Sequence, residues 1–307
     1  MATIQNEDWN PVQSKIVQVL NTPDVTTNDL GYNTSYGSGQ VADLATVTGA
    51  QWNALRTDVN KAYLLQTGSN SDLTTRDSTA KITQADLTTI SARVDTAYSN
   101  RGSISTGQLN FVAGPSFSQS FTFSGGFTTI DATITWANNA AFRGFWNGGG
   151  RIVITGSRSG GDPTPQNQSW TNLMTNMGSI VLTRTGMFQS GNNWTGTFLN
   201  SWGNGMYGSQ SVLPGIARAF TISSQDTNYT ANNFEIRLAG NSDNIKTMTS
   251  LRILTDWTDG HQAQGSNTPS EVGGGGPTGF GPDYGNGTIS NSCAIYYPFA
   301  ETRPNNY

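Results

Sequence analysis

Apolar side chains recur at helical spacing near the start of the chain. Within residues 9–21 they fall at intervals of three and four, at Val12, Ile16, Val19 and Leu20. This spacing puts them on one face of an α-helix. Asn10 is a suitable capping residue and Pro11 a suitable first helical residue, so we expect the helix to begin there.

Two further helices are predicted before residue 106. One runs from about Thr48 to Gln66 and ends at Gly68, and the other begins at a capping-box-like pair, Thr83 and Asp86. Their apolar stripes are Trp52, Leu55, Val59, Ala62 and Tyr63 in the first helix and Leu87, Ile90, Val94, Ala97 and Tyr98 in the second. Each stripe is narrow and has a polar back, so another element must cover it. The same chain or a neighbouring copy can supply that element, and the sequence leaves both alternatives open.

From about residue 106 the apolar period shortens to that of β-strands. Eight or nine short runs rich in β-branched and aromatic residues are separated by Gly, Asn, Ser and Asp. The runs are SFTF, TIDATITWA, RIVITGS, IVLTRTGMF, WTGTFLN, ARAFTISSQ, NFEIRLAG, SLRILTDW and SCAIYYPF. They predict an antiparallel β-sandwich that is jelly-roll-like, with one exception, a short helix-like segment at residues 169–178. The expected fold class is therefore α+β, with a helical region at residues 1–105 and a sandwich at residues 106–307.

A glycine cluster lies within FWNGGGRIVITGSRSGG, residues 145–161. A phosphate-binding loop needs a strand, then glycines, then a helix whose amides face the anion. Here the glycines precede the strand and no lysine follows, so we expect a turn that leads into the sheet. Arg151 and Arg158 in this segment are expected to be solvated or bonded to backbone.

The composition restricts the class of protein. Asp, Glu, Lys and Arg make up only 12% of the 307 residues, and the formal net charge is −4, whereas charged residues are about 25% of an ordinary globular protein. Nucleic-acid binding needs clustered Lys and Arg, which are missing from this sequence. No apolar run is long enough to cross a membrane, and the first residues lack the pattern of a secretory signal.

The residues used in common catalytic and metal sites are scarce. The chain has one cysteine, Cys293, and one histidine, His261. Cys293 lies in a strand-like run and is expected to be an inert buried thiol, and His261 is expected in an exposed loop. Asp256 and Asp259 lack the pattern of an EF-hand loop, so we expect them to cap turns at a strand end. We therefore predict no enzymatic activity, no cofactor and no metal site.

Aromatic residues among glycines and asparagines offer a different kind of site. Trp194, Trp202 and Tyr207 lie in NNWTGTFLNSWGNGMYG. Rings in such settings either fill the core of a sandwich or stack on sugars at its surface. Core packing is the favoured interpretation, and glycan stacking is kept as the alternative.

Several segments together resemble one family. DWNPVQSKIVQVLNTP, GYNTSYGSGQV and TGAQWNALRTDVNKAYLLQTG, followed by AAFRGFWNGGGRIVITGSRSGG and PQNQSWTNLMTNMGSIVLT, resemble virion structural proteins of T4-like tailed phages, in particular cyanophage-type myoviruses. The resemblance covers most of residues 1–200. It implies a structural component of the particle and carries no active site with it.

These observations lead to an expected function. We expect a non-enzymatic virion protein of the neck or tail, such as a collar, appendage or fibre-attachment component, made in the cytoplasm of the bacterial host. The helical region would attach it to the particle, with copies of itself, expected as a trimer, and other neck, tail or capsid proteins as partners. The alternatives are a glycan- or receptor-binding module of the tail fibre or baseplate, with host surface glycan as partner, and a head decoration protein.

Overall fold

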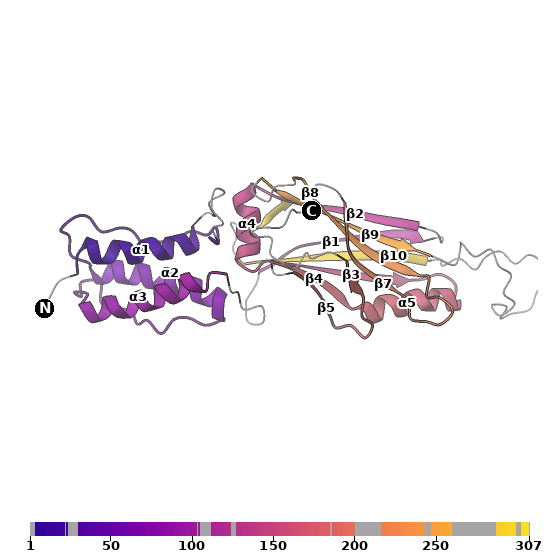
Figure 1. Cartoon of the computed structure of the whole chain (residues 1–307), viewed down its shortest axis with the longest axis horizontal. Helices are drawn as coiled ribbons and strands as arrows, with labels where there is room; N and C mark the ends of the chain where they lie inside the picture. The colour runs from indigo at the N-terminus through magenta and orange to yellow at the C-terminus, as the bar shows by residue number, and fades with distance from the viewer. Residues whose placement is uncertain are drawn as a thin grey trace, which may run out of the picture.

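The computed structural model divides the chain into a helical part and a sheet-rich part. It describes residues 4–21, 23, 30–102, 104, 112–123, 127–184, 186–199, 216–242, 247–259, 287–298 and 302–306. Helices α1 to α3 lie at one end of an elongated molecule and the strands at the other, with α4 between them (Figure 1). The α+β class with a sheet-rich C-terminal region is thereby confirmed.

The helical part contains α1 (Asn6–Leu20), α2 (Gly49–Thr67) and α3 (Gln84–Ser99). The predicted capping box of Thr83 and Asp86 at α3 is confirmed, and α2 has a second one, formed by Thr48 and Gln51. Gly68 ends α2 in the left-handed conformation, as expected.

The expected start of the first helix is wrong. It begins at Asn6, Gln5 occupies its N-cap position without a side-chain hydrogen bond, and Pro11 lies inside it. Pro11 is in the second turn, where the amide it lacks would have bonded within the helix. The side chain of Asn10 is instead used outside the helix, because its amide donates to the carbonyl oxygen of Val41 at 3.0 Å and its oxygen accepts the Val41 N–H at 2.8 Å.

The three apolar stripes cover one another within the chain. Trp9 and Ile16 of α1, Trp52 of α2 and Ile90 of α3 belong to one cluster of buried side chains. Each helix lies against the other two. The alternative left open by the sequence is thus settled in favour of the same chain. The apolar stripes of these three helices therefore give no support to self-association.

The strands of the described residues form two antiparallel sheets. The five-stranded sheet has the order β1 (Val112–Phe123), β10 (Gly287–Tyr297), β3 (Arg151–Ser159), β4 (Ser179–Thr183) and β5 (Gly186–Ser190). The six-stranded sheet has the order β11 (Pro304–Asn306), β2 (Phe127–Trp136), β9 (Ser250–Thr258), β8 (Asn233–Gly240), β7 (Ala217–Ser223) and β6 (Thr197–Phe198).

A second apolar core lies between the sheets. Alternate residues of β10, including Ile289 and Cys293, are buried. They belong to one cluster with Ile253 and Trp257 of β9 in the other sheet. The alternation turns one face of each sheet toward the other and the opposite face outward. Jelly-roll connectivity stays a prediction.

Two helices accompany the sheets, and one of them was not predicted from the sequence. α4 (Asn139–Asn147) begins at an Asn138 cap and buries nearly all of its side chains at the end of the sandwich. α5 (Pro165–Met177) is longer than the expected segment at residues 169–178. The glycine cluster follows α4 and leads directly into β3, with Gly149 at φ 87°. The predicted turn into a strand is therefore confirmed, although a helix precedes it.

Candidate functional site

Of the three candidate sugar-stacking residues, the described part of the chain includes one, Trp194. Trp194 lies after β5, is partly buried and packs against the core between the sheets. Its main-chain N–H donates to the carbonyl oxygen of Asn176 at 3.0 Å. Trp202, Tyr207 and His261 lie outside the described residues. For these aromatic residues core packing stays the favoured prediction and glycan stacking the alternative.

The position of Cys293 agrees with the prediction that its thiol is buried. Its side chain is 2% exposed on the inner face of β10. Burial raises the pKa of Cys293 to about 12. A protonated thiol is a poor nucleophile and a poor metal ligand.

The expectation that Asp256 caps a turn is wrong, because this residue lies within β9 on the outer face of its sheet. Arg237 of β8 donates to its carboxylate through both Nε and Nη2, and Thr129 of β2 donates to it at 2.6 Å. Glu235, beside Arg237 on β8, lies 3.0 Å from Nε of Arg218, and burial raises the pKa of Glu235 above its usual value. These acidic and basic groups compensate one another, which is the arrangement of a structural ion-pair network.

Asp259 also has a protein partner. The Nε2 of Gln166 at the start of α5 donates to its Oδ1 at 2.6 Å and to Oδ1 of Asn232 at 3.0 Å. All three side chains are buried. Throughout the described part of the chain, no group of three or more His, Cys, Asp or Glu side chains is arranged to hold a metal ion.

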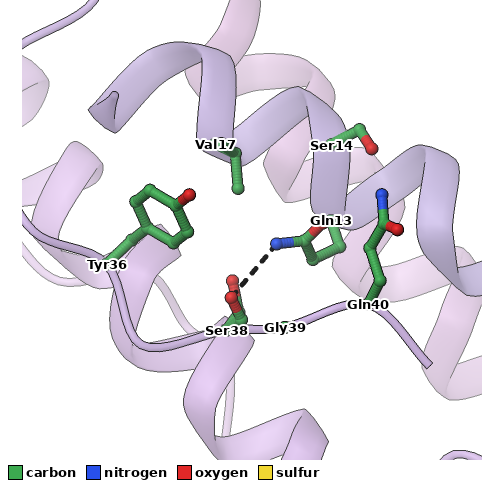
Figure 2. Close-up of a pocket in the computed structure, with 7 residues that line it drawn as sticks. All are labelled: Gln13, Ser14, Val17, Tyr36, Ser38, Gly39 and Gln40. Atoms are coloured by element: carbon green, nitrogen blue, oxygen red, sulfur yellow. Dashed lines mark hydrogen bonds between the residues drawn. The ribbon is translucent and has the colours of Figure 1, made fainter. Parts of the chain in front are cut away.

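A groove is present on the helical part. It lies between α1 and the loop that carries Tyr36 and has a volume of about 290 Å³ (Figure 2). Its lining residues are Gln13, Ser14, Val17, Tyr36, Ser38, Gly39 and Gln40. Figure 2 shows the Tyr36 ring at one end, Gln40 at the other and the oxygen atoms of Ser38 directed toward α1 between them.

The loop beside this groove is held from both sides. Asp58 of α2, which is 2% exposed, accepts the N–H of Gly37 at 3.0 Å and the N–H of Ser38 at 2.8 Å. From α1, the amide of Gln13 donates to the carbonyl oxygen of Ser38 at 3.1 Å. Lys61 of α2 donates to the carbonyl oxygen of Ser35 at 2.6 Å. The loop has no regular hydrogen-bonded structure, and these side chains fix its path instead.

The chemistry of the groove is that of hydrogen bonding. Its lining offers two carboxamides, two serine hydroxyls and one phenol, together with the side chain of Val17. None of these lining residues is a carboxylate, imidazole, amine or thiol, so the lining holds no general base to activate a hydroxyl. The groove can accommodate a neutral polar group, and it has no machinery for acid–base or nucleophilic catalysis.

The helical part and the sandwich meet in a junction, which we define by Gly31, Gly102, Gly144, Asn147 and Arg184. The buried amide of Asn147 at the end of α4 donates to the carbonyl oxygen of Gly31 at 2.8 Å. Nη1 of Arg184, after β4, donates to the carbonyl oxygen of Gly102 at 2.6 Å. A Cβ added to Gly144 would lie 2.4 Å from Cβ of Asn33, so α4 touches the loop with no space for a side chain.

Comparison with protein-family models, curated proteins and solved structures finds no match. Within the described residues, no helix combines the length and the apolar character that crossing a membrane requires.

The sequence does contain a signal for α4, the helix at the junction. Asn138 is a typical N-cap residue, and Phe142, Phe145 and Trp146 follow at helical spacing, so α4 was recognisable. The loop hydrogen bonds of Asp58 and Gln13 leave no such signal, because the bonded atoms are main-chain groups of residues that are distant in sequence.

Proposed function

We propose that the chain is a non-enzymatic structural protein of a tailed-phage particle, of the neck or tail. The helical part attaches it to the particle and the sandwich projects outward. Copies of the chain and other neck, tail or capsid proteins are its partners. The proposal starts from the resemblance of most of residues 1–200 to virion structural proteins.

The junction is the observation that supports this proposal best. Two of the segments that carry the resemblance meet there, since Gly31 belongs to GYNTSYGSGQV and Asn147 to AAFRGFWNGGGRIVITGSRSGG. Their contact is a buried hydrogen bond beside a close approach at Gly144. A fixed connection between an attachment part and a projecting part suits a particle component. The hydrogen-bonding lining of the groove adds no catalytic group that would favour an enzyme instead.

Particle fractionation tests the proposal. Phage particles made by a host that carries the gene are purified by density gradient, washed at high salt and probed with an antibody against the full chain. The chain should remain with the particles and label one axial position in electron micrographs. A host cytosolic protein followed in the same gradient serves as the control. Recovery of the chain only among unassembled proteins would exclude a structural role.

Glycan binding is a second candidate, favoured by one observation. Trp194 is partly exposed although it packs against the core between the sheets. Titration calorimetry of the full chain with host surface glycans tests the candidate, with Trp194→Ala compared with Phe188→Ala as a control for loss of an exposed ring on β5. Binding that survives Trp194→Ala rules out a stacking role for this residue.

A further inference from the structure

β1 is an exposed sheet edge of unusual length. It has twelve residues, and within the described part of the chain it pairs with β10 on one side and with no strand on the other. The other edge strands of the described sheets are short, with five residues in β5, two in β6 and three in β11. Proteins usually protect long edges with charged residues, bulges or proline, because an open edge offers unpaired N–H and C=O groups to another strand. Val112–Phe123 contains no charged residue.

The protected and open portions of β1 can be separated. Its register with β10 shifts between Ala113 and Ser116, on either side of Pro115, which has no N–H. From Ser116 to Phe123 the pairing with β10 is continuous. Of this portion, Ser118, Ser120 and Phe121 are exposed, and Phe121 is 45% exposed. The open edge therefore begins directly after the bulge.

The sequence of this open portion is symmetric about Gln119. Residues 116–122 read Ser-Phe-Ser-Gln-Ser-Phe-Thr, so the order of hydroxyl and aromatic residues is the same in both directions. Two identical antiparallel strands related by a two-fold axis at Gln119 place each residue opposite its own kind. In this backbone register Ser118 pairs with Ser120 of the second copy, and residue 121 pairs with residue 117. The next pair in this register would be residues 123 and 115, and it breaks the match because residue 115 is proline.

We propose that β1 pairs antiparallel with β1 of a second copy of the chain, with the two-fold axis at Gln119. The pairing is isologous and closed, as in most homodimers. It joins the two five-stranded sheets into one continuous sheet and satisfies backbone groups that are otherwise open at the edge. It also places Phe121, an exposed aromatic residue at the rim of the sandwich, against the other copy. The inference names a self-association surface for the proposed particle protein and stands or falls independently of the phage assignment.

The outer face of the sheet is compatible with this pairing. Ser118 and Ser120 lie in rows with Ser292 and Ser290 of β10, and the hydroxyls of Ser120 and Ser290 are 2.6 Å apart. The rows are uncharged and continue into β3 through a 2.7 Å contact between the hydroxyls of Ser292 and Thr155. A second copy extends these rows without placing like charges opposite one another.

Disulfide trapping tests the register. Residues directly opposite in an antiparallel pair have Cα atoms about 4.5–5.5 Å apart, within the range that a disulfide spans. Gln119→Cys should therefore form a disulfide-linked dimer under mild oxidation at low protein concentration. Ser190→Cys, an exposed position on the opposite edge strand β5, is the matched control and should stay monomeric. Buried Cys293 does not interfere. Equal cross-linking of the two variants would overturn the register.

A charge exchange tests the interface itself. Light scattering of the native chain should give twice the mass of the 32.8 kDa monomer. The double variant Ser118→Lys/Ser120→Lys sets like charges opposite one another and should be monomeric. Ser118→Lys/Ser120→Glu sets Lys opposite Glu of the second copy and should restore the dimer. Circular dichroism shows whether each variant folds. A monomeric native chain, or a Lys/Lys variant that remains a dimer, would refute the proposal.

Discussion

The buried carboxylate of Asp58 allows a quantitative prediction. Asp58→Ala removes the acceptor of the Gly37 and Ser38 N–H groups, at 3.0 and 2.8 Å, beneath a loop with no strand or helix of its own. Ser38 is buried whereas Gly37 is exposed, so water can replace the lost acceptor of the Gly37 N–H. The unsatisfied Ser38 N–H then costs about 1–3 kcal/mol. This is an appreciable fraction of the free energy of unfolding of a typical domain, which is about 5–15 kcal/mol.

Urea unfolding followed by far-UV circular dichroism measures this loss through the helical signal. Asp43→Ala is the matched control, because Asp43 is exposed and its carboxylate accepts one bond, from Asn6 at 2.9 Å. It should change the free energy of unfolding by less than about 0.5 kcal/mol. Hydrogen exchange at Gly37 and Ser38 should accelerate in Asp58→Ala alone. Equal effects of the two substitutions would refute the argument that Asp58 holds the loop.

Three further outcomes are expected. Gly144→Ala introduces a Cβ 2.4 Å from Asn33 Cβ, and this overlap should destabilise the chain by about 1–3 kcal/mol, offset by about 1 kcal/mol of gained helix propensity. Gly39→Ala is the control, because its Cβ meets no atom within 4 Å, and urea unfolding compares the two variants. Burial raises the pKa of Asp86, but the hydrogen bonds from Arg76 and Thr83 outweigh it, so the pKa is lowered in the folded chain. The contribution of Asp86 to stability is therefore complete above the unfolded pKa of about 4 and is lost as the pH falls below it. Asp86→Asn should reduce this loss of stability in acid, as measured by pH-dependent thermal melts. Iodoacetamide should leave Cys293 unmodified in the folded chain at about pH 8 and alkylate it in denaturant, as measured by mass spectrometry.

Local signals predicted the fold well where they coincide with the packing. Thr83 and Asp86 mark the start of α3, and Gly68 marks the end of α2, because capping depends on residues only three or four positions apart. Pro11 misled the prediction for α1, since the helix begins well before it, at Asn6. Asn10, the expected cap, is instead hydrogen-bonded to Val41 in the following loop.

The roles of polar side chains in the sites were harder to predict. Asp256 reads as a turn residue in TDWTDG, but its role depends on Arg237, which lies on the neighbouring strand. Trp194 does not reveal from its sequence context whether its ring faces the core or the solvent. The groove depends on Asp58 and Gln13, which reach the same loop from two different helices. Such contacts follow from the packing of distant segments, and local pattern carries no information about them.

The junction has a mechanical consequence. In chain order α3 is followed by β1, so one covalent connection joins the helical part, which we also call the bundle, to the sandwich. One connection alone does not fix the orientation of two parts. The bundle is held at two separate places, however, by Asn147 at Gly31 and by Arg184 at Gly102. Two points of attachment resist rotation about the long axis as well as bending across it. A torque applied to the sandwich would therefore pass into the bundle, so that the two ends of the molecule turn together.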